Sequence, residues 1–324
     1  MSVDGPRGGL LVLVSGGTAT MSGVGGLAVS ADGVGVLQAV AERFADEHGT
    51  RVGVELDPPM RDSAEMTPDD WDRWRRRIGV ALADGVGVVL VHGTDTMAYT
   101  AAALAYAHAD ANGPVVLTGS QRAATAAGSD AAGNLRHALE IAATGTPGVV
   151  VAFAGRVLAA ATVWKRSTTD VDAFDGLAGR STRSRAVVPS FQGYDASRVV
   201  EIATVTLGRW HDQLDWAHRP DGVVLRVLGS GTAPADPRAH ARLEALRRDG
   251  VPVLAVSQIP GALVDLSRYE AGRGLVEAGV VSCGAITAEA AYAKLHYLLG
   301  SPGARERLRS LVTTDLVGEA RSAR

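Results

Sequence analysis

Short apolar runs bounded by glycines recur along the first half of the chain. Stretches with helical spacing, such as VLQAVAERFADEHG and TMAYTAAALAYAHAD, separate several of these runs. The runs cover residues 9–15, 51–56, 85–92, 113–119 and 148–155. Near-continuous Val and Leu runs that alternate with helices are typical of parallel strands with helices on both faces. The pattern therefore predicts an α/β fold with a parallel sheet in its N-terminal part.

The same pattern indicates two domains. The chain has 324 residues, which exceeds the size at which a single hydrophobic core stops growing. Around residues 180–203 the sequence changes to Arg, Ser, Pro, Gln and Gly, and the apolar runs then resume. We expect a larger N-terminal domain over residues 1–183, a linker over 184–203 and a smaller α/β domain over 204–324.

A helix is predicted for TPDDWDRWRRRIGVALADG, residues 67–85. Thr67 is a suitable N-cap, Pro68 fits the first helical position and Gly85 fits the end. The densest basic run of the chain lies inside this helix, but aspartates stand beside it. We interpret the run as a solvated helix face rather than a binding patch.

Composition and charge narrow the classes of partner. The net charge is −3 and the isoelectric point is about 6.2, so no basic surface for nucleic acid or an anionic membrane is expected. The apolar stretch near the N-terminus is too short for a signal peptide or a membrane span, which favours a soluble cytoplasmic protein. Cys283 is the only cysteine and is expected to be a small core residue, and no Cys/His spacing indicates a metal site.

Polar residues cluster where the predicted strands end. In a parallel sheet, ligands bind at the carboxyl ends of the strands, where loop amides and helix N-termini converge. Any single Gly-Thr or Gly-Ser pair is most simply a turn with a helix cap. Several such ends together predict a small-molecule pocket, and the candidates are Ser15–Thr18, Asp62–Ser63, His92–Thr96 with Gly93, Thr118–Ser120 and Lys165.

Nucleotide-binding and serine-hydrolase motifs are missing from these strand ends. GGTATMSGVGG has no lysine for a phosphate-binding loop and does not fit the dinucleotide fingerprint, and no nucleophile elbow surrounds Ser15. A threonine nucleophile remains, and it needs a base close by. Thr94, Asp95 and Lys165 can supply one if Lys165 is desolvated; the alternative is an ordinary surface lysine. His92 is expected to orient the turn that follows it.

These motifs resemble those of the bacterial-type L-asparaginases, the threonine amidohydrolases. SGGTAT is similar to the N-terminal T-G-G-T-I motif of the family, and VHGTDTMAYTAAAL matches its H-G-T-D-T-[ML] signature. The order and spacing of further segments agree over nearly the whole chain, and the C-terminal part is similar to the cytosolic type I branch. These segments are MRDSAEMTPDDWDRW, PVVLTGSQ, GSDAAGNLRHAL, TVWKRSTTDVDAF, GRGLVEAGVVSCGAITAEAAYAKLHYLLG and TTDLVGE.

The resemblance implies a role for each matching residue. Thr18 is the implied nucleophile, which forms an acyl-enzyme with the side chain of asparagine and releases ammonia. A second catalytic set, Thr94, Asp95 and Lys165, activates a hydroxyl or water. Backbone amides near Ala19 and Thr94 stabilise the oxyanion. The residues implied in substrate binding are Asp62, Ser63, Gly93 and Ser120, with Asp95 contributing to the same function. No cofactor and no metal are implied.

The chain departs from the family pattern at two places. The family has a tyrosine in the loop after Gly-Gly-Thr, whereas this chain has none before Tyr99, and Gly26 is the best positional match. Thr232 in GSGTAP replaces an asparagine. The family assembles sites between subunits, so a homodimer or homotetramer is expected, and Tyr269 or Glu270 of a partner chain is a candidate substitute for the tyrosine.

These departures leave the activity open between three interpretations. The first is hydrolysis of L-asparagine. The second is deamidation of another small amide or of a tRNA-linked amide. The tRNA-linked substrate is the less favoured of these two, because the sequence shows no added basic domain that would bind tRNA. The third is a ligand-binding homologue whose turnover is weakened because the loop tyrosine is missing.

Overall fold

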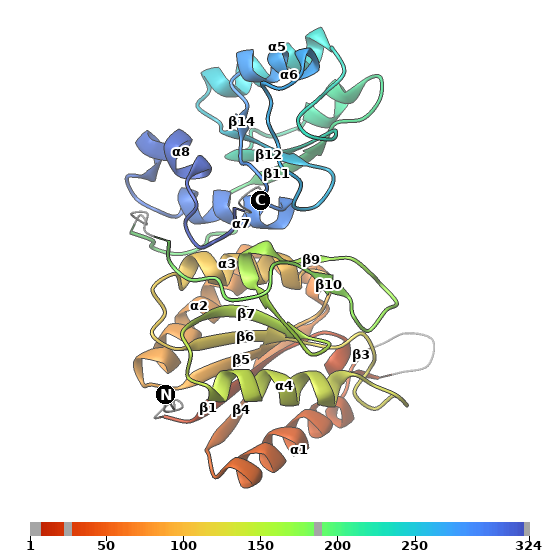
Figure 1. The fold of residues 1–324 in the computed structure, drawn as a ribbon, viewed down its shortest axis with the longest axis vertical. Coiled ribbons are helices and arrows are strands. Elements are labelled where there is room, and N and C mark those ends of the chain that lie inside the picture. The colour runs from red at the N-terminus through yellow and green to blue at the C-terminus, as the bar shows by residue number, and fades with distance from the viewer. Residues whose placement is uncertain (1–7, 23–27, 185–189, 321–324) are drawn as a thin grey trace. The chain divides into compact units, whose positions relative to one another are not determined.

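Each apolar run of the N-terminal half forms a strand of one six-stranded sheet (Figure 1). Neighbouring strands are parallel except β8, which is antiparallel to β7. The order is β4-β1-β5-β6-β7-β8, formed by β1 (Leu10–Gly16), β4 (Val52–Arg61), β5 (Gly87–Val91), β6 (Pro114–Thr118), β7 (Gly148–Phe153) and β8 (Arg156–Ala159). The computed structural model describes residues 8–22, 28–184 and 190–320. The predicted parallel sheet is confirmed.

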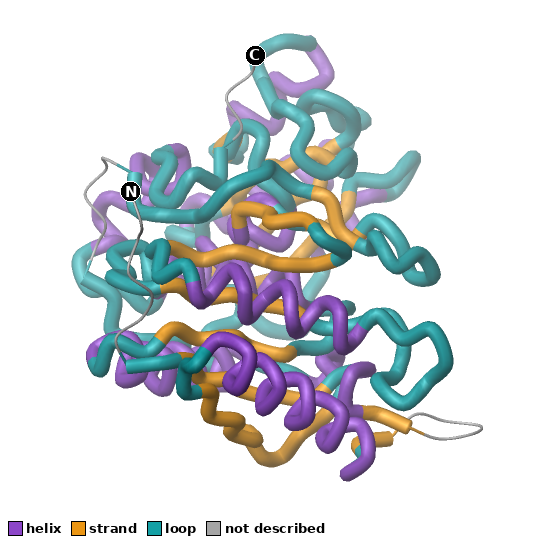
Figure 2. Tube along the Cα trace, turned by 60° about the horizontal axis from the view of Figure 1, so that its bottom comes forward, coloured by secondary structure: helices purple, strands orange, loops and turns teal. Residues whose placement is uncertain are grey.

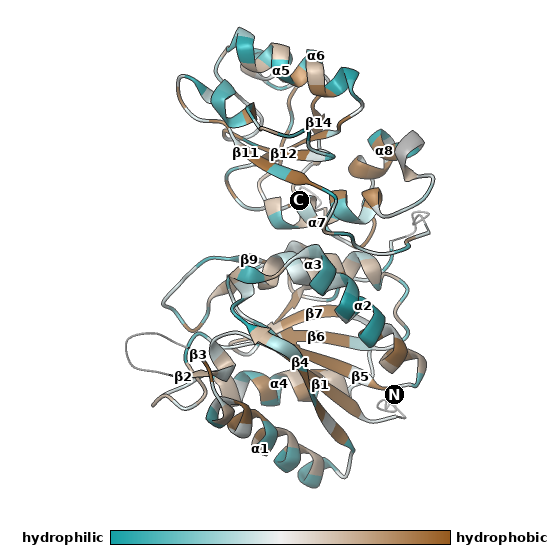
Figure 3. Ribbon diagram, turned by 180° about the vertical axis from the view of Figure 1, so that it is seen from behind, coloured by the Kyte–Doolittle hydropathy of each residue, from teal (hydrophilic) through white to brown (hydrophobic). Residues whose placement is uncertain are grey.

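Helices cover both faces of this sheet (Figures 1 and 2). One face carries α1 (Ala31–His48) and α4 (Ala131–Ala143), and the other carries α2 (Pro68–Ala83) and α3 (Met97–Ala107). Phe44 of α1 and Leu135 of α4 pack into the same buried cluster as Val12 of β1 and Val89 of β5. β1, β5, β6 and β7 are buried on both faces, and they are apolar rather than alternating except at Ser15 and Thr118, near the carboxyl ends of β1 and β6 (Figure 3).

The helix predicted from residue 67 is α2. A capping box joins Thr67 to Asp70, whose carboxylate accepts a hydrogen bond from the Thr67 main-chain nitrogen at 2.8 Å. The arginines of the basic run pair with acidic residues: Arg73 with Asp57, Arg75 and Arg76 with Asp72, and Arg77 with Glu55. The run is therefore an ion-paired helix face, which agrees with its interpretation from the sequence.

Short elements complete this unit and carry several polar residues of the predicted pocket. Thr18 begins η1, Ser63 begins η2 and Lys165 ends β9. The elements are η1 (Thr18–Thr20), β2 (Met21–Ser22), β3 (Ala28–Val29), η2 (Ser63–Glu65), η3 (Ala160–Thr162), β9 (Trp164–Lys165) and β10 (Phe174–Asp175).

The second unit is a smaller α/β fold with its own core. The chain divides between Thr182 and Arg183. Four parallel strands lie in the order β11-β12-β13-β14, formed by β11 (Val200–Thr204), β12 (Gly222–Val227), β13 (Val253–Ser257) and β14 (Val281–Ser282). The helical elements are η4 (Trp210–Leu214), α5 (Pro237–Arg248), α6 (Glu270–Glu277), α7 (Ala288–Leu299) and α8 (Ala304–Thr313). β11 begins inside the range 184–203 that the sequence predicts as a linker.

Cys283 lies directly after β14 and is buried. It is therefore a small core residue, as expected, and burial raises the pKa of its thiol to about 12. Within the described ranges, no helix is long and apolar enough to cross a membrane. The same ranges contain no group of three or more His, Cys, Asp and Glu side chains arranged to hold a metal ion.

A buried ion pair fixes the end of the second unit. Lys294 of α7 and Glu319 are both almost fully buried and lie 2.7 Å apart. Lys294 also donates to the main-chain oxygens of Val312 and Thr314, and Glu319 accepts from the main-chain nitrogen of Leu316. Burial acts to raise the pKa of Glu319, but the Lys294 charge and the accepted hydrogen bonds outweigh it and lower this pKa.

We expect Glu319→Gln to lower the free energy of unfolding by about 3–5 kcal/mol, because it removes the carboxylate that the buried Lys294 ammonium contacts directly. Urea unfolding measures the effect. Glu270→Gln is the matched control, since Glu270 forms an exposed ion pair with Arg273 and should cost less than about 1 kcal/mol. Equal costs for the two variants would contradict this account.

Candidate active site

A cavity of about 310 Å³ lies in the first unit, where the turns after β1, β4, β5 and β6 meet. Apart from Ser120, every catalytic and substrate-binding side chain that the resemblance implies lines it, together with Gly93. The lining residues are Gly17, Thr18, Asp62, Ser63, Gly93, Thr94, Asp95, Gln121, Lys165 and Thr168. A larger cavity of about 400 Å³ lies in the second unit, but its lining has no hydroxyl, lysine or histidine side chain. The chemistry expected from the sequence therefore gathers in the smaller cavity.

Two glycines allow the turns after β1 and β5 to touch. A Cβ on Gly17 would lie 2.3 Å from the α-carbon of Gly93, and a Cβ on Gly93 would lie 2.6 Å from the Ser63 hydroxyl oxygen. Gly17 also has a φ of 80°, which L side chains rarely adopt. Because neither position has a side chain, the neighbouring residues Thr18 and Thr94 line one small cavity.

Lys165 joins the Thr94–Asp95 pair. Its ammonium lies 2.7 Å from the Thr94 hydroxyl oxygen and 2.6 Å from an Asp95 carboxylate oxygen. The side chain of Lys165 is 16% exposed and that of Asp95 is 64% exposed. Lys165 is held in place by β9, which pairs with Phe174 of β10. Lys165 is partly buried and donates two hydrogen bonds. It is therefore not an ordinary surface lysine, which is the alternative that the sequence leaves open.

His92 holds the turn before Thr94 and does not line the cavity. The Trp71 indole donates to the Thr100 hydroxyl at 3.0 Å, and this hydroxyl lies 3.0 Å from His92 Nε2. An indole can only donate, so the Thr100 hydrogen is free to point at Nε2, which leaves Nδ1–H to donate to the Gly93 carbonyl at 2.7 Å. Burial lowers the pKa of His92 to about 4, so the ring is neutral at pH 7.

Asp62 and Ser63 enter the cavity from the turn after β4. Asp62 caps η2 by accepting from the Ala64 main-chain nitrogen at 2.9 Å, and it is exposed. Ser63 is 2% exposed, and its main-chain oxygen accepts from the Thr96 hydroxyl at 2.8 Å. The Thr96 contact ties this turn to the His92–Thr96 segment, so that a carboxylate and a hydroxyl face the same space as Thr94.

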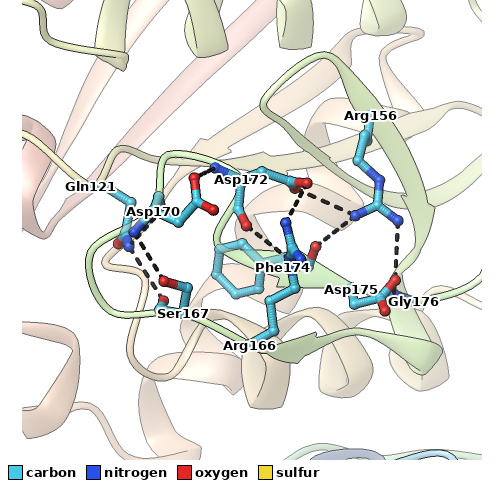
Figure 4. Close-up of polar contacts among 9 residues, drawn as sticks. All are labelled: Gln121, Arg156, Arg166, Ser167, Asp170, Asp172, Phe174, Asp175 and Gly176. Carbon is cyan, nitrogen blue, oxygen red and sulfur yellow. Dashed lines mark hydrogen bonds and ion pairs between the residues drawn. The ribbon is translucent and has the colours of Figure 1, made fainter.

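Gln121, rather than Ser120, reaches the cavity from the turn after β6. The Ser120 hydroxyl donates to the Arg122 main-chain oxygen at 2.6 Å, within its own turn. The side chain of Gln121 accepts from the Thr94 hydroxyl at 3.1 Å. Its nitrogen donates to the main-chain oxygens of Ser167 and Asp170, as Figure 4 shows. The sequence pattern does not indicate Gln121, because the feature that marks the candidate residues is a hydroxyl side chain beside a glycine. Gln121 nevertheless follows the same strand end as Ser120.

The structure describes one of the two positions at which the chain departs from the expected pattern. Gly26 falls outside the described residues. Thr232 lies in the second unit and donates to the Leu228 main-chain oxygen at 3.3 Å. Tyr269 is 47% exposed, and Glu270 pairs with Arg273 at 2.8 Å. A contribution of Tyr269 or Glu270 to a neighbouring subunit's site stays a prediction.

We expect Gly93→Ala to lower the free energy of unfolding by about 1–3 kcal/mol, because the added methyl group would overlap Ser63 and Gly17. Gly35→Ala is the control: Gly35 lies in α1 and its added Cβ would have no neighbour within 4 Å. That variant should be neutral or gain up to about 1 kcal/mol. Urea unfolding compares the two, and an unchanged stability of Gly93→Ala would argue against the close contact.

Two family models match this chain, and several known proteins are similar to it over most of its length. Residues 9–184 match the family model described as "Asparaginase, N-terminal", and residues 189–312 match "Glutaminase/Asparaginase C-terminal domain". An L-asparaginase of Thermococcus kodakarensis is 33% identical, over 96% of this chain and 98% of that protein. The solved thermostable L-asparaginase from that organism superposes with a TM-score of 0.80 at 31% identity, covering 97% of this chain and 99% of the other.

Two further relatives, from other organisms, are also at least 30% identical to this chain. L-asparaginase 1 of Escherichia coli is 30% identical, over 81% of this chain and 82% of that protein. One component of the glutamyl-tRNA(Gln) amidotransferase of Aeropyrum pernix is 31% identical, over 79% of this chain and 66% of that protein. Both family models together span nearly all of the chain, and they place the cavity residues within the N-terminal match. The chain belongs to the asparaginase family.

Proposed function

We propose that this protein hydrolyses L-asparagine to L-aspartate and ammonia. The observation that carries the proposal is the 2.7 Å contact between Lys165 Nζ and Thr94 Oγ1 in a cavity that Thr18 also lines. Membership of the asparaginase family supports the same reaction. A cavity of about 310 Å³ suits a small amino acid.

In the first proposed step, the Thr18 hydroxyl attacks the side-chain amide carbon of the substrate. Its proton passes through the Thr94–Lys165 pair to the leaving nitrogen, so that ammonia departs and an ester on Thr18 remains. Main-chain N–H groups near Ala19 and Thr94 stabilise the negative charge that develops on the amide oxygen. In the second step, water attacks the ester, and aspartate and the free Thr18 hydroxyl result. The whole reaction consumes one water and requires no cofactor.

The charges around the cavity suit the backbone end of an amino acid. The exposed carboxylates of Asp62 and Asp95 can accept hydrogen bonds from the α-ammonium group, and the Ser63 hydroxyl can donate to the α-carboxylate. Gly93 contributes main-chain contact and close approach. The expected contact of Ser120 with substrate is indirect, through the turn that carries Gln121.

The absence of a tyrosine before Tyr99 favours a second candidate, a ligand-binding homologue with weakened turnover. Calorimetry with L-aspartate separates the two candidates, because binding without ammonia release would support the second. Deamidation of another small amide is the remaining alternative, and a panel of L-asparagine, D-asparagine and L-glutamine tests it. The net charge of −3 gives no support to a tRNA-linked substrate.

We also propose that the protein is cytoplasmic and forms a homodimer or homotetramer. Family membership supports a closed homo-oligomer. Sedimentation equilibrium of the full chain measures the assembly, and a monomer at micromolar concentration would contradict it.

We expect Thr18→Ala, Thr94→Val and Lys165→Met each to lower kcat for L-asparagine by about 10²–10⁴-fold, because each removes the nucleophile or its proton path. An ammonia-release assay measures turnover, and thermal unfolding checks that the fold persists. Thr313→Val is the control, since Thr313 is exposed at the end of α8 and should leave kcat unchanged. Full activity in any of the three site variants would refute the role of that residue.

A further inference from the structure

The Gln121 side chain bridges the two parts of the site that carry the proposed proton transfer. On one side it contacts the Thr94 hydroxyl at 3.1 Å. On the other it contacts the turn that follows Lys165, where the main-chain oxygens of Ser167 and Asp170 lie 3.3 and 3.1 Å from its nitrogen (Figure 4). The proposed reaction steps leave Gln121 without a role.

The chemistry of its neighbours decides which way the Gln121 amide points. Main-chain oxygens can only accept hydrogen bonds, so Nε2 must face Ser167 and Asp170. The opposite atom, Oε1, is therefore the one that faces Thr94. This orientation follows from the bonding partners alone, because the reverse orientation would place two acceptor pairs in contact.

The position of the Thr94 hydrogen follows in turn. A charged Lys165 ammonium can only donate, so the Thr94 oxygen accepts from it at 2.7 Å. The single hydrogen of Thr94 then has one partner left among these contacts, the Oε1 atom of Gln121. One lone pair of the Thr94 oxygen stays available for a hydroxyl or water that enters the cavity.

We infer that Gln121 is a positioning residue that orients the Thr94 hydroxyl in the resting site, where Lys165 is charged. Its amide oxygen holds the Thr94 hydrogen without removing it, since an amide oxygen is too weak a base to take that proton at neutral pH. Its amide nitrogen holds the turn after Lys165, so that Nζ stays in reach of Thr94. When Lys165 is neutral, its nitrogen can accept the Thr94 hydrogen in place of Gln121, and the Thr94 oxygen then takes the proton of an entering hydroxyl.

The surrounding structure fixes Gln121 from both ends. The main-chain nitrogen of Gln121 donates to Asp130 at 3.0 Å, and Asp130 also accepts from Asn134 of α4. The turn on the far side is held by ion pairs of its own, in which Arg166 and Arg156 each contact Asp172 (Figure 4). Gln121 thus joins two segments that each have further contacts of their own, as a positioning role requires.

The expected effect of Gln121 on turnover rests on the proposed function, hydrolysis of L-asparagine. We expect Gln121→Met to lower kcat for L-asparagine about 10- to 100-fold, as for other small misplacements of catalytic groups. KM should change less than about threefold, because Asp62 and Ser63 keep their contacts. Gln38→Met is the matched control, since Gln38 is exposed on α1 and should leave both constants unchanged. An unchanged kcat in Gln121→Met would overturn the inference.

A double-variant cycle separates positioning from a purely structural role. In the Thr94→Val background there is no hydroxyl to orient, so adding Gln121→Met should lower the residual turnover no further. A structural role would instead produce the same fold loss in both backgrounds, and that result would overturn the inference. Urea unfolding measures the contribution of the Ser167 and Asp170 contacts, which should be equal in both backgrounds.

A spectroscopic readout tests the inference without turnover. The chain has two lysines, Lys165 and Lys294, so protein with ¹³C-labelled lysine gives two Cε signals. Gln121→Met should shift the Lys165 signal and leave that of Lys294, which lies in the second unit, unchanged. Gln38→Met should shift neither, and an unmoved Lys165 signal in Gln121→Met would contradict the inference. If the unaltered protein hydrolyses no amide while the Lys165 signal responds, the proposed function fails and the assignment of the Thr94 hydrogen stands.

Discussion

The contact between the turns after β1 and β5 is the constraint on which the site depends. The two strands are adjacent and parallel, so their carboxyl ends are neighbours by topology. Neighbouring strands are about 4.8 Å apart, which leaves no room for side chains between turns that also have to carry hydroxyl groups. Gly17 and Gly93 remove those side chains, and Thr18 and Thr94 line a common space as a result. Glycine is therefore required at positions 17 and 93, because a Cβ at either position would overlap the neighbouring turn.

Much of this arrangement can be predicted from sequence because it is set by local pattern. Apolar runs alternating with helices specify the parallel sheet, and polar residues directly after the runs specify the cavity. What local pattern cannot show is which of two neighbouring side chains turns inward. Ser120 and Gln121 follow the same strand, yet the Ser120 hydroxyl bonds within its own turn. The Gln121 side chain instead bonds to three residues that are separated from it by 27, 46 and 49 positions in the sequence. Such long-range contacts depend on how the turns pack, and no periodicity records them.

The domain boundary illustrates the same limit. Polar and Pro-containing composition near residue 190 indicates a connection between units, but composition does not say where the next strand begins. β11 is an edge strand beside β12, and Val200 starts it within a stretch whose composition is that of an irregular segment. An edge strand has one bonded neighbour and needs fewer apolar residues than the buried strands of the first sheet, so its pattern is weaker.

The exposure of the cavity residues gives the proposed substrate a direction of entry. The carboxylates of Asp62 and Asp95 are exposed, whereas the hydroxyls of Ser63 and Thr94 are buried. A zwitterionic amino acid that kept its α-ammonium at the exposed carboxylates would lose little hydration there, and its neutral amide would extend toward the buried hydroxyls. In that drier space, hydrogen bonds to a developing oxyanion are stronger than they would be in water. The neutral His92 and the amide of Gln121 suit this inner layer, because they orient Gly93 and Thr94 without adding a charge that would compete with Lys165.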